Sequence, residues 1–311
     1  MTQTVATGAG LTPRAPVAAS ARRRAADRWS RRAPLLPALL FAIVVTQIPF
    51  LVTIYLSTLD WNALRPGERS FIGLANYAEV LTDSRLRAAL TNTVVLTAGA
   101  VVASVLLGLG VAILLDRRFP GRGIVRTLLI TPFLVMPMAA ALLWKHAIYN
   151  PAYGLINGVL GGSTDWVSQY PMLSVVATLV WQWTPFMMLI ILAGLQSQST
   201  EILEAARVDG AGGWQIFTRI TLPHLRPYLE LGALLGSIYL VQTFDAVFTI
   251  TQGGPGTATT NLPYEIYLTT FRKFEYGEAA AAGVVVVIGT IVVATFALRV
   301  ISSLFRMEDA R

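Results

Sequence analysis

Long runs without a single charged residue are the feature that most constrains this fold. Four of them occur, at residues 33–59, 88–115, 166–200 and 279–298. Each is long enough for a helix of about 20 apolar residues, the length that crosses a bilayer. Of the 311 residues only 13% are charged, whereas a soluble domain has about a quarter. The sequence therefore predicts an all-α integral membrane protein.

Two further segments are weaker candidates for membrane spans. Residues 127–144 are uncharged but stop at Lys145, whose long stem can reach the membrane interface. Residues 227–250 carry Glu230 near the start and Asp245 near the end. Whether this second segment crosses has to be decided from the positions of the basic residues in the loops.

Basic residues are unevenly divided between alternate loops. Seven arginines precede the first run, four lie in residues 116–126, three in 196–226 and three after residue 298. The alternate loops hold four in the longer segment 60–87, none in 148–170 and two in 252–277. Because positive loops stay in the cytoplasm, both termini are expected there. An even number of crossings follows, and we predict six spans, at about 35–57, 92–115, 127–146, 171–195, 228–250 and 279–300.

The remaining composition adds little to this assignment. Residues 1–32, rich in Ala, Arg, Thr and Pro, are predicted to form a disordered cytoplasmic tail in front of one membrane domain at 33–311. The net charge of +7 comes mostly from that tail and from short loops, which fits membrane topology better than a nucleic-acid-binding face. The absence of cysteine excludes disulfides and thiolate chemistry.

The loop at 196–226 is polar and reads as a helix-turn-helix. Thr200 can cap the first helix, with Glu201 in its first turn, where the helix dipole favours an acid. Gly210 can adopt the left-handed conformation that ends a helix. The second helix shows an apolar residue at every third position: Trp214, Phe217 and Ile220. Pro223 is expected to end it.

Two interpretations of this loop are open from the residues alone. It can be a connector that lies on the membrane surface, held there by Trp214 and Phe217. Alternatively, it can be a compact, rigid knob that docks onto a soluble partner.

A spacing pattern in this loop resembles a known family. The sequence reads E-A-A, three residues, G, nine residues, I-x-L-P, and the matching positions are Glu204, Ala205, Ala206, Gly210, Ile220, Leu222 and Pro223. This is similar to the cytoplasmic signature of the membrane subunits of binding-protein-dependent ABC importers. In that family the loop is a coupling helix that inserts into a cleft of the ATP-hydrolysing subunit, and the resemblance implies the same role for these residues.

Other loops resemble the sugar-type (MalF/UgpA-like) members of this family. The segments are FIGLANYAEVL at 71–81, NPAYGLINGVLGG at 150–162, and 244–267, which includes T-x-G-G-P-x-x-x-T at 251–259. Residues 230–290 are most similar to sorbitol/mannitol-type permeases. The resemblance implies the six-helix type I importer (MetI-like) permease fold, a sugar or polyol as solute, and the bacterial cytoplasmic membrane as location.

The energy source must lie outside this chain. A P-loop ends in G-K-[ST], but the two lysines, Lys145 and Lys273, follow Trp and Arg. No cofactor is therefore expected on this chain. The resemblance implies an ATPase dimer that holds ATP and magnesium, a second homologous permease subunit and an extracytoplasmic solute-binding protein. Membrane lipid is the remaining partner, and no nucleic acid is expected.

Polar and aromatic residues inside the spans are candidates for a solute path. Tyr239, Gln242 and Asp245 recur at spacing three, so a continuous helix would place them along one face. Trp183 lies too deep for an ordinary aromatic belt and can stack on a sugar ring, although core packing is the simpler role. Gly232 and Gly236 form a GxxxG pair, which predicts close helix packing.

Other functions have less support. A secondary transporter or channel would need ionisable groups in several spans or a ring of charges along a pore. An intramembrane enzyme would need a catalytic cluster, yet His146 and His224 are predicted on opposite sides of the membrane. Metal binding is not expected either. The predicted function is a transport subunit and not an enzyme.

Overall fold

Helices make up most of the described structure. The computed structural model describes residues 35–65 and 67–306, so the predicted tail at 1–32 lies outside the described residues. The exception to the helices is a small antiparallel sheet in which β1 (Leu59–Trp61) pairs with β2 (Arg69–Phe71). The chain divides into two units, residues 1–53 and 54–311, and each is described by itself.

The N-terminal unit contributes most of α2 (Leu36–Leu56), which coincides with the first predicted span. Its 21 residues carry no charge. At 1.5 Å per residue a helix of this length extends roughly 30 Å, which matches the hydrocarbon core of a bilayer.

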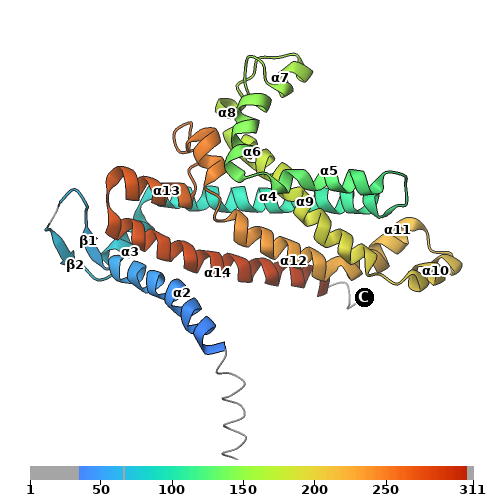
Figure 1. Cartoon of the computed structure of the whole chain (residues 1–311), viewed down its shortest axis with the longest axis horizontal. Coiled ribbons are helices and arrows are strands. Elements are labelled where there is room, and N and C mark those ends of the chain that lie inside the picture. Colours follow the sequence, from blue (N-terminus) through green and yellow to red (C-terminus); the bar gives the residue numbers. More distant parts are fainter. Residues whose placement is uncertain (1–34, 66, 307–311) are drawn as a thin grey trace, which may run out of the picture. The chain divides into compact units, whose positions relative to one another are not determined.

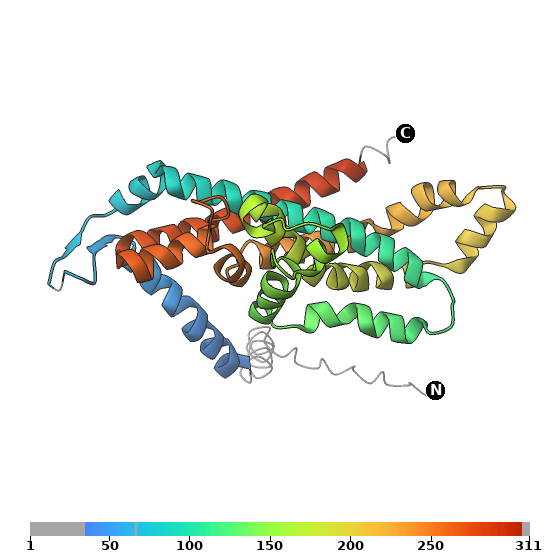
Figure 2. The same ribbon diagram turned by 90° about the horizontal axis from the view of Figure 1, so that it is seen from above.

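The second unit is built around four long helices, shown in Figures 1 and 2. They are α4 (Ser84–Asp116), α9 (Pro171–Gln196), α12 (Leu222–Leu240) and α14 (Tyr276–Arg306). The shorter elements are α3 (Ala75–Thr82), α7 (Leu155–Leu160), α8 (Trp166–Gln169), α13 (Leu262–Leu268) and η5 (Thr269–Lys273). The loop at 116–126 lies at the same end of this unit as the loop at 196–226, opposite the β1–β2 hairpin (Figure 2).

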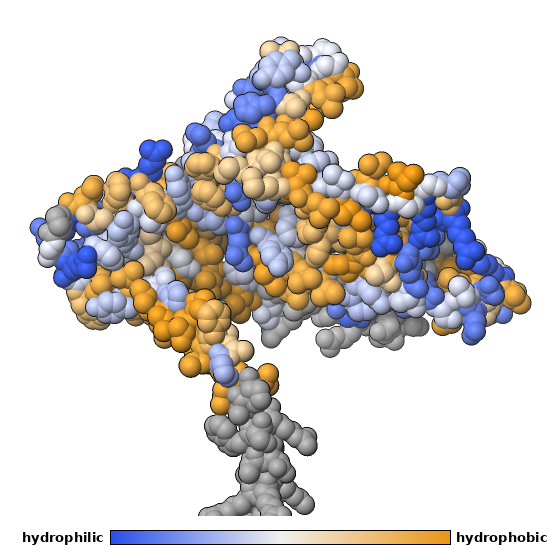
Figure 3. All heavy atoms as spheres, in the orientation of Figure 1, coloured by the Kyte–Doolittle hydropathy of each residue, from blue (hydrophilic) through white to orange (hydrophobic). Residues whose placement is uncertain are grey.

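Hydrophilic side chains gather at the end of the second unit that carries these two loops, whereas apolar side chains cover much of its middle (Figure 3). Arg117, Arg118 and Arg207 are exposed at that end. This distribution agrees with a segment of apolar helices that lies in lipid and with loops that lie in water.

Small residues let the long helices approach closely. A β-carbon at Gly108 of α4 would lie 2.8 Å from the β-carbon of Met187 in α9. The GxxxG pair of α12 packs against the same methionine, because a β-carbon at Gly232 would lie 3.2 Å from its sulfur and one at Gly236 would overlap its methyl group. The predicted close packing at this pair is confirmed.

The third predicted span is not one straight helix. Helix α5 (Arg122–Leu134) is followed by α6 (Pro137–Leu143) and the π-helical turn η2 (Trp144–Ile148), with a bend of 99° at the break. Val135 is extended at this point. The amide of Gln182 in α9 donates a hydrogen bond of 3.0 Å to the freed carbonyl of Val135. Non-helical backbone at membrane depth needs such a partner.

Lys145, at the end of this segment, is bonded to another part of the chain. Its ammonium group donates to the carbonyl of Thr249, at 2.7 Å. The predicted reach of its stem to the membrane interface stays a prediction. Thr249 belongs to the π-helical turn η4 (Val247–Thr251). The contact therefore joins two segments that follow breaks in helices.

The fifth predicted span, 228–250, is also wrong as a single helix. Helix α12 starts earlier, at Leu222, and ends at Leu240, before the turn at η4. Glu230 is paired with Arg226 at 2.9 Å, so its charge is compensated within the helix. The buried side chain of Asn261 donates to the carbonyl of Thr243 in the break. Here again a helix breaks inside an apolar region, and the carbonyl that loses its helical partner accepts a hydrogen bond from a side chain elsewhere in the sequence.

Three helices in the described part of the chain, α2, α4 and α9, are long and apolar enough to cross a membrane. A fourth follows if the bent pair of α5 and α6–η2 counts as one span. The apolar part of α14, Tyr276–Val292, is shorter. Six crossings therefore remain a prediction.

Candidate functional site

The segment between α9 and α12 folds as the predicted helix-turn-helix. Helix α10 (Thr200–Val208) is followed by α11 (Gly213–Ile216) and the π-helical turn η3 (Phe217–Thr221), at one end of the second unit (Figure 2). Glu201 lies in the first turn of α10, as expected. The residue at the cap position is Ser199 and not Thr200, which is already the first helical residue.

Gly210 makes the turn between the two helices. Its φ of +85° lies in the left-handed region, which confirms the predicted helix end. The N–H of Ala211 reaches back to the carbonyl of Ala206 at 3.0 Å and closes the turn. A β-carbon at Gly210 would meet no atom within 4 Å, so the outer side of the turn is open.

The E-A-A residues and their neighbours present a surface with an apolar part. Glu204 and Ala205 are exposed, and Ala206 is half-buried. Next to them, Ile202 is 55%, Val208 87% and Trp214 75% exposed. These exposed apolar side chains suit contact with another apolar surface. The same side chains would also suit the alternative of a membrane-surface connector.

The end of the motif is continuous with a long helix. Pro223 was expected to end the second helix, but α11, η3 and α12 follow one another without interruption from residue 213 to 240. In the π-helical turn the N–H of Leu222 bonds to the carbonyl of Phe217, five residues back. Pro223 follows directly after this wide turn, as the second residue of α12. Ile220 and Leu222 are half-buried, and Pro223 is exposed.

A second candidate site is a group of aromatic rings from three helices. The ring of Trp183 in α9 lies 5.6 Å from Tyr239 in α12, 5.6 Å from Phe133 in α5 and 5.6 Å from Phe186 in α9. Trp183 is half-buried and Tyr239 is 60% exposed. The two predicted aromatic residues are thus brought together, and Phe133 and Phe186 are additions that no spacing in the sequence indicates.

Gln242 and Asp245 do not share a helical face with Tyr239. Because α12 ends at Leu240, Gln242 lies in the following turn, exposed, with its amide bonded to the carbonyl of Ile238 at 3.0 Å. Asp245 is half-buried at the start of the next helical turn. The predicted single face is wrong, since it assumed a helix without a break.

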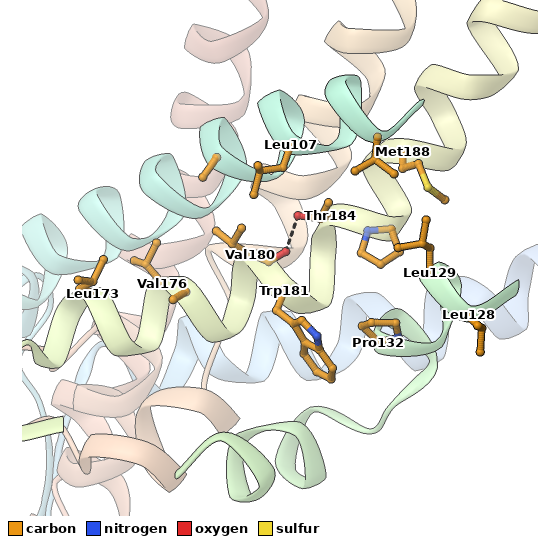
Figure 4. A pocket seen from close by; sticks show the side chains of 14 residues that line it. Leu107, Leu128, Leu129, Pro132, Leu173, Val176, Val180, Trp181, Thr184 and Met188 are labelled. Atoms are coloured by element: carbon orange, nitrogen blue, oxygen red, sulfur yellow. Dashed lines mark hydrogen bonds between the residues drawn. The ribbon is translucent and has the colours of Figure 1, made fainter. Parts of the chain in front are cut away.

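Helix α9 also borders an apolar pocket of about 560 Å³, which lies between α4, α5 and α9 (Figure 4). Trp181 lines it, pointing away from Trp183, because two residues along a helix are roughly 200° apart. The hydroxyl of Thr184, also in the lining, donates to the carbonyl of Val180 at 2.6 Å. The pocket offers a polyhydroxylated solute few partners, unlike the half-open aromatic group.

The two histidines show no sign of metal chemistry. Among the described residues, no three or more His, Cys, Asp or Glu side chains form a group that could hold a metal ion. His146 is exposed on η2. His224 lies in the first turns of α12, 3.1 Å from the Ser197 hydroxyl.

Residues 100–307 match the family model described as the inner membrane component of binding-protein-dependent transport systems. A probable ABC transporter permease protein, y4oQ of Sinorhizobium fredii, is 38% identical over 79% of this chain and 81% of its own length. The trehalose/maltose transport system permease MalF of Thermococcus litoralis is 32% identical over 85% of this chain and 90% of its own. The sn-glycerol-3-phosphate transport system permease UgpA of Agrobacterium fabrum is 34% identical, with coverages of 85% and 94%.

The fold is similar to a chain in a solved structure. That structure is a bacterial alginate ABC transporter in complex with an alginate pentasaccharide-bound periplasmic protein. The TM-score is 0.75 at 20% sequence identity, and the alignment covers 88% of this chain and 94% of the other.

Proposed function

Because the chain belongs to the family of inner membrane components of binding-protein-dependent transport systems, we propose that it moves a sugar or a sugar alcohol into the cell. Members of this family are multi-pass permease subunits of ABC transporters and not enzymes themselves. The observation that carries the proposal is the likeness, at 32% to 34% identity over 85% of this chain, to permeases of trehalose/maltose and glycerol-phosphate systems. The proposal of a sugar alcohol as solute rests on the resemblance of residues 230–290 to sorbitol/mannitol-type permeases.

The proposed coupling element is the segment 200–223. Glu204, Ala205, Ala206 and Gly210 would contact a cleft on an ATPase dimer, which holds ATP and magnesium. The exposed position of this turn and the open space at Gly210 support the assignment. Ile220, Leu222 and Pro223 would connect the contact to α12, since the helical run from residue 213 to 240 has no gap. This side and both termini would then be cytoplasmic.

The other proposed partners are a second, homologous permease and an extracytoplasmic solute-binding protein. The mechanism would be alternating access. ATP binding closes the ATPase dimer, the movement reaches this chain through the coupling element, and the bundle opens toward the binding protein to receive solute.

The aromatic group of Trp183 and Tyr239 is the proposed solute path, with Gln242 and Asp245 beyond the end of α12. Trp183→Ala should lower uptake at least tenfold, or about 1.4 kcal/mol, because a sugar ring would lose a stacking surface. Uptake of labelled solute by cells measures this. Trp181→Ala is the matched control, since it removes the same side chain from the other side of α9, and should keep uptake near the wild-type rate.

An equal loss in both tryptophan variants would contradict the assignment of the path, since it would indicate a general packing defect. Asp245→Ala extends the test to the outer residues. Unchanged uptake and unchanged solute preference in that variant would remove Asp245 from the path.

The solute class is tested by uptake of a panel of labelled sugars and polyols in a strain that lacks this chain. Restoration of uptake for one sugar or polyol by the plasmid-borne gene is expected. Uptake that is restored without dependence on an ATPase would overturn the proposed function. So would a failure to restore uptake of any sugar or polyol in the panel. Genes for an ATPase, a second six-span protein and a secreted binding protein are expected nearby.

A further inference from the structure

Four residues tie the two ends of the coupling element together. The Ser197 hydroxyl, just after α9, donates to the Gly194 carbonyl at 2.8 Å. Its oxygen lies 2.9 Å from the Tyr228 hydroxyl of α12. His224 Nε2, also in α12, lies 3.1 Å from the Ser197 hydroxyl and 3.1 Å from the Gly194 carbonyl. We call Gly194, Ser197, His224 and Tyr228 the clamp.

The hydrogen positions in the clamp follow from the chemistry of its groups. A carbonyl oxygen only accepts, so Nε2 of His224 must carry the proton that reaches Gly194. The Ser197 hydroxyl donates its single hydrogen to the same carbonyl. Toward Tyr228 it can then only accept, so the Tyr228 hydroxyl is the donor of that bond. Gly194 is among the last residues of α9, and its carbonyl also accepts a hydrogen bond from the backbone N–H of Ser197, at 3.2 Å. Side chains that flank the coupling element therefore add to the backbone hydrogen bonds that end α9.

Packing brings α9 and α12 close together at the same place. A β-carbon at Gly194 would lie 2.7 Å from the Tyr228 ring and 2.9 Å from a methyl group of Leu225. A further contact lies next to the clamp, where the Thr221 hydroxyl donates to the side-chain oxygen of Gln198 at 3.3 Å. Both ends of the segment 198–221 are thus held by side chains as well as by the chain itself.

The points that could bend lie beside these contacts. Helix α9 ends at Gln196, and Ser199 is extended before α10 begins. A push on α10 could therefore be absorbed by rotation at 197–199 unless this connection is braced. The clamp is the brace, because it bonds this connection to α12 through His224 and Tyr228.

We propose that the clamp residues are positioning residues for transport, which make the coupling element move as one body with α9 and α12. A displacement at α10 then reaches the helices that carry Trp183 and Tyr239. This inference rests on the proposed function, since it assumes that the segment 200–223 receives the movement of an ATPase.

The test measures ATP hydrolysed per solute transported by the complete transporter in proteoliposomes. His224→Leu removes the proton that reaches Gly194, and should lower uptake at least tenfold while ATP hydrolysis stays near the wild-type rate. His224→Gln should restore most of the uptake, because its amide can donate to the same carbonyl. His146→Leu, the same change at the exposed histidine of η2, is the control and should behave as wild type.

A milder variant covers the case in which His224→Leu fails to fold. Tyr228→Phe removes one oxygen and keeps the ring against Gly194, so a smaller rise in ATP used per solute is expected. The proposal would be overturned if both variants hydrolysed as much ATP per transported solute as the wild type, whether or not both rates fell together. Loss of ATPase binding in these variants would also overturn it. Failure of the proposed function is distinguishable, because the wild-type chain would then show no ATP-dependent uptake.

Discussion

Gly210→Asp is expected to leave the protein inserted in the membrane and to abolish both transport and binding of the ATPase. A β-carbon at this position meets no atom of the chain within 4 Å, so the new side chain causes no internal clash. The left-handed backbone, with φ of +85°, costs a residue other than glycine only about 1–2 kcal/mol. The loss would therefore come from the proposed contact with the ATPase, where a buried, unpaired carboxylate is costly.

Two measurements check this expectation. The ATPase should no longer co-purify with the variant, and solute uptake should fall at least tenfold, which corresponds to a free-energy difference of about 1.4 kcal/mol. Gly121→Asp is the matched control. Gly121 also has a positive φ, of +82°, and open space around it, and it lies in the loop at 116–126. Normal uptake by the Gly210 variant would refute the coupling assignment, and equal losses in both variants would point to backbone strain instead.

Gly108→Ala is expected to destabilise the packing of α4 against α9. The added β-carbon would lie 2.8 Å from the Met187 β-carbon and 2.9 Å from the backbone nitrogen of Met188. Backbone atoms cannot turn aside as a flexible side chain can, so the two helices must separate. Overpacking of this kind typically costs about 1–3 kcal/mol.

Gly110→Ala, two residues along the same helix, is the control for Gly108→Ala. No atom lies within 4 Å of its added β-carbon, and alanine is the better helix former by about 1 kcal/mol. Thermal unfolding in detergent should show a lower midpoint for the Gly108 variant and an equal or higher midpoint for the Gly110 variant. Two variants of equal stability would contradict the described helix contact.

The helix-turn-helix of α10 and α11 was largely predictable, because its signals are local. Gly210 follows an amphipathic turn and has the freedom to adopt a positive φ, so its position predicted the helix end that the structure shows. The GxxxG pair of Gly232 and Gly236 likewise predicted a close approach. The role of Pro223 was not predictable, because a π-helical turn upstream changes which N–H groups are needed.

The aromatic group shows where prediction from spacing stops. Trp183 and Tyr239 were candidates for separate reasons, and their contact at 5.6 Å depends on how α9 meets α12. Phe133 joins them only because α5 ends beside α9 before the chain turns away. No periodicity within one segment contains that information.

The amino-acid sequence alone determined the class of the protein, its apolar helices and its polar helix-turn-helix, because hydropathy, charge placement and glycine freedom are properties of short segments. Only the tertiary structure decided where those helices break. At Val135 the backbone leaves the helix, and its carbonyl accepts a hydrogen bond from the side-chain amide of Gln182. At Thr243 the carbonyl likewise accepts from the side-chain amide of Asn261. A broken and an unbroken apolar helix have the same composition, so the choice depends on a partner that only folding brings within reach.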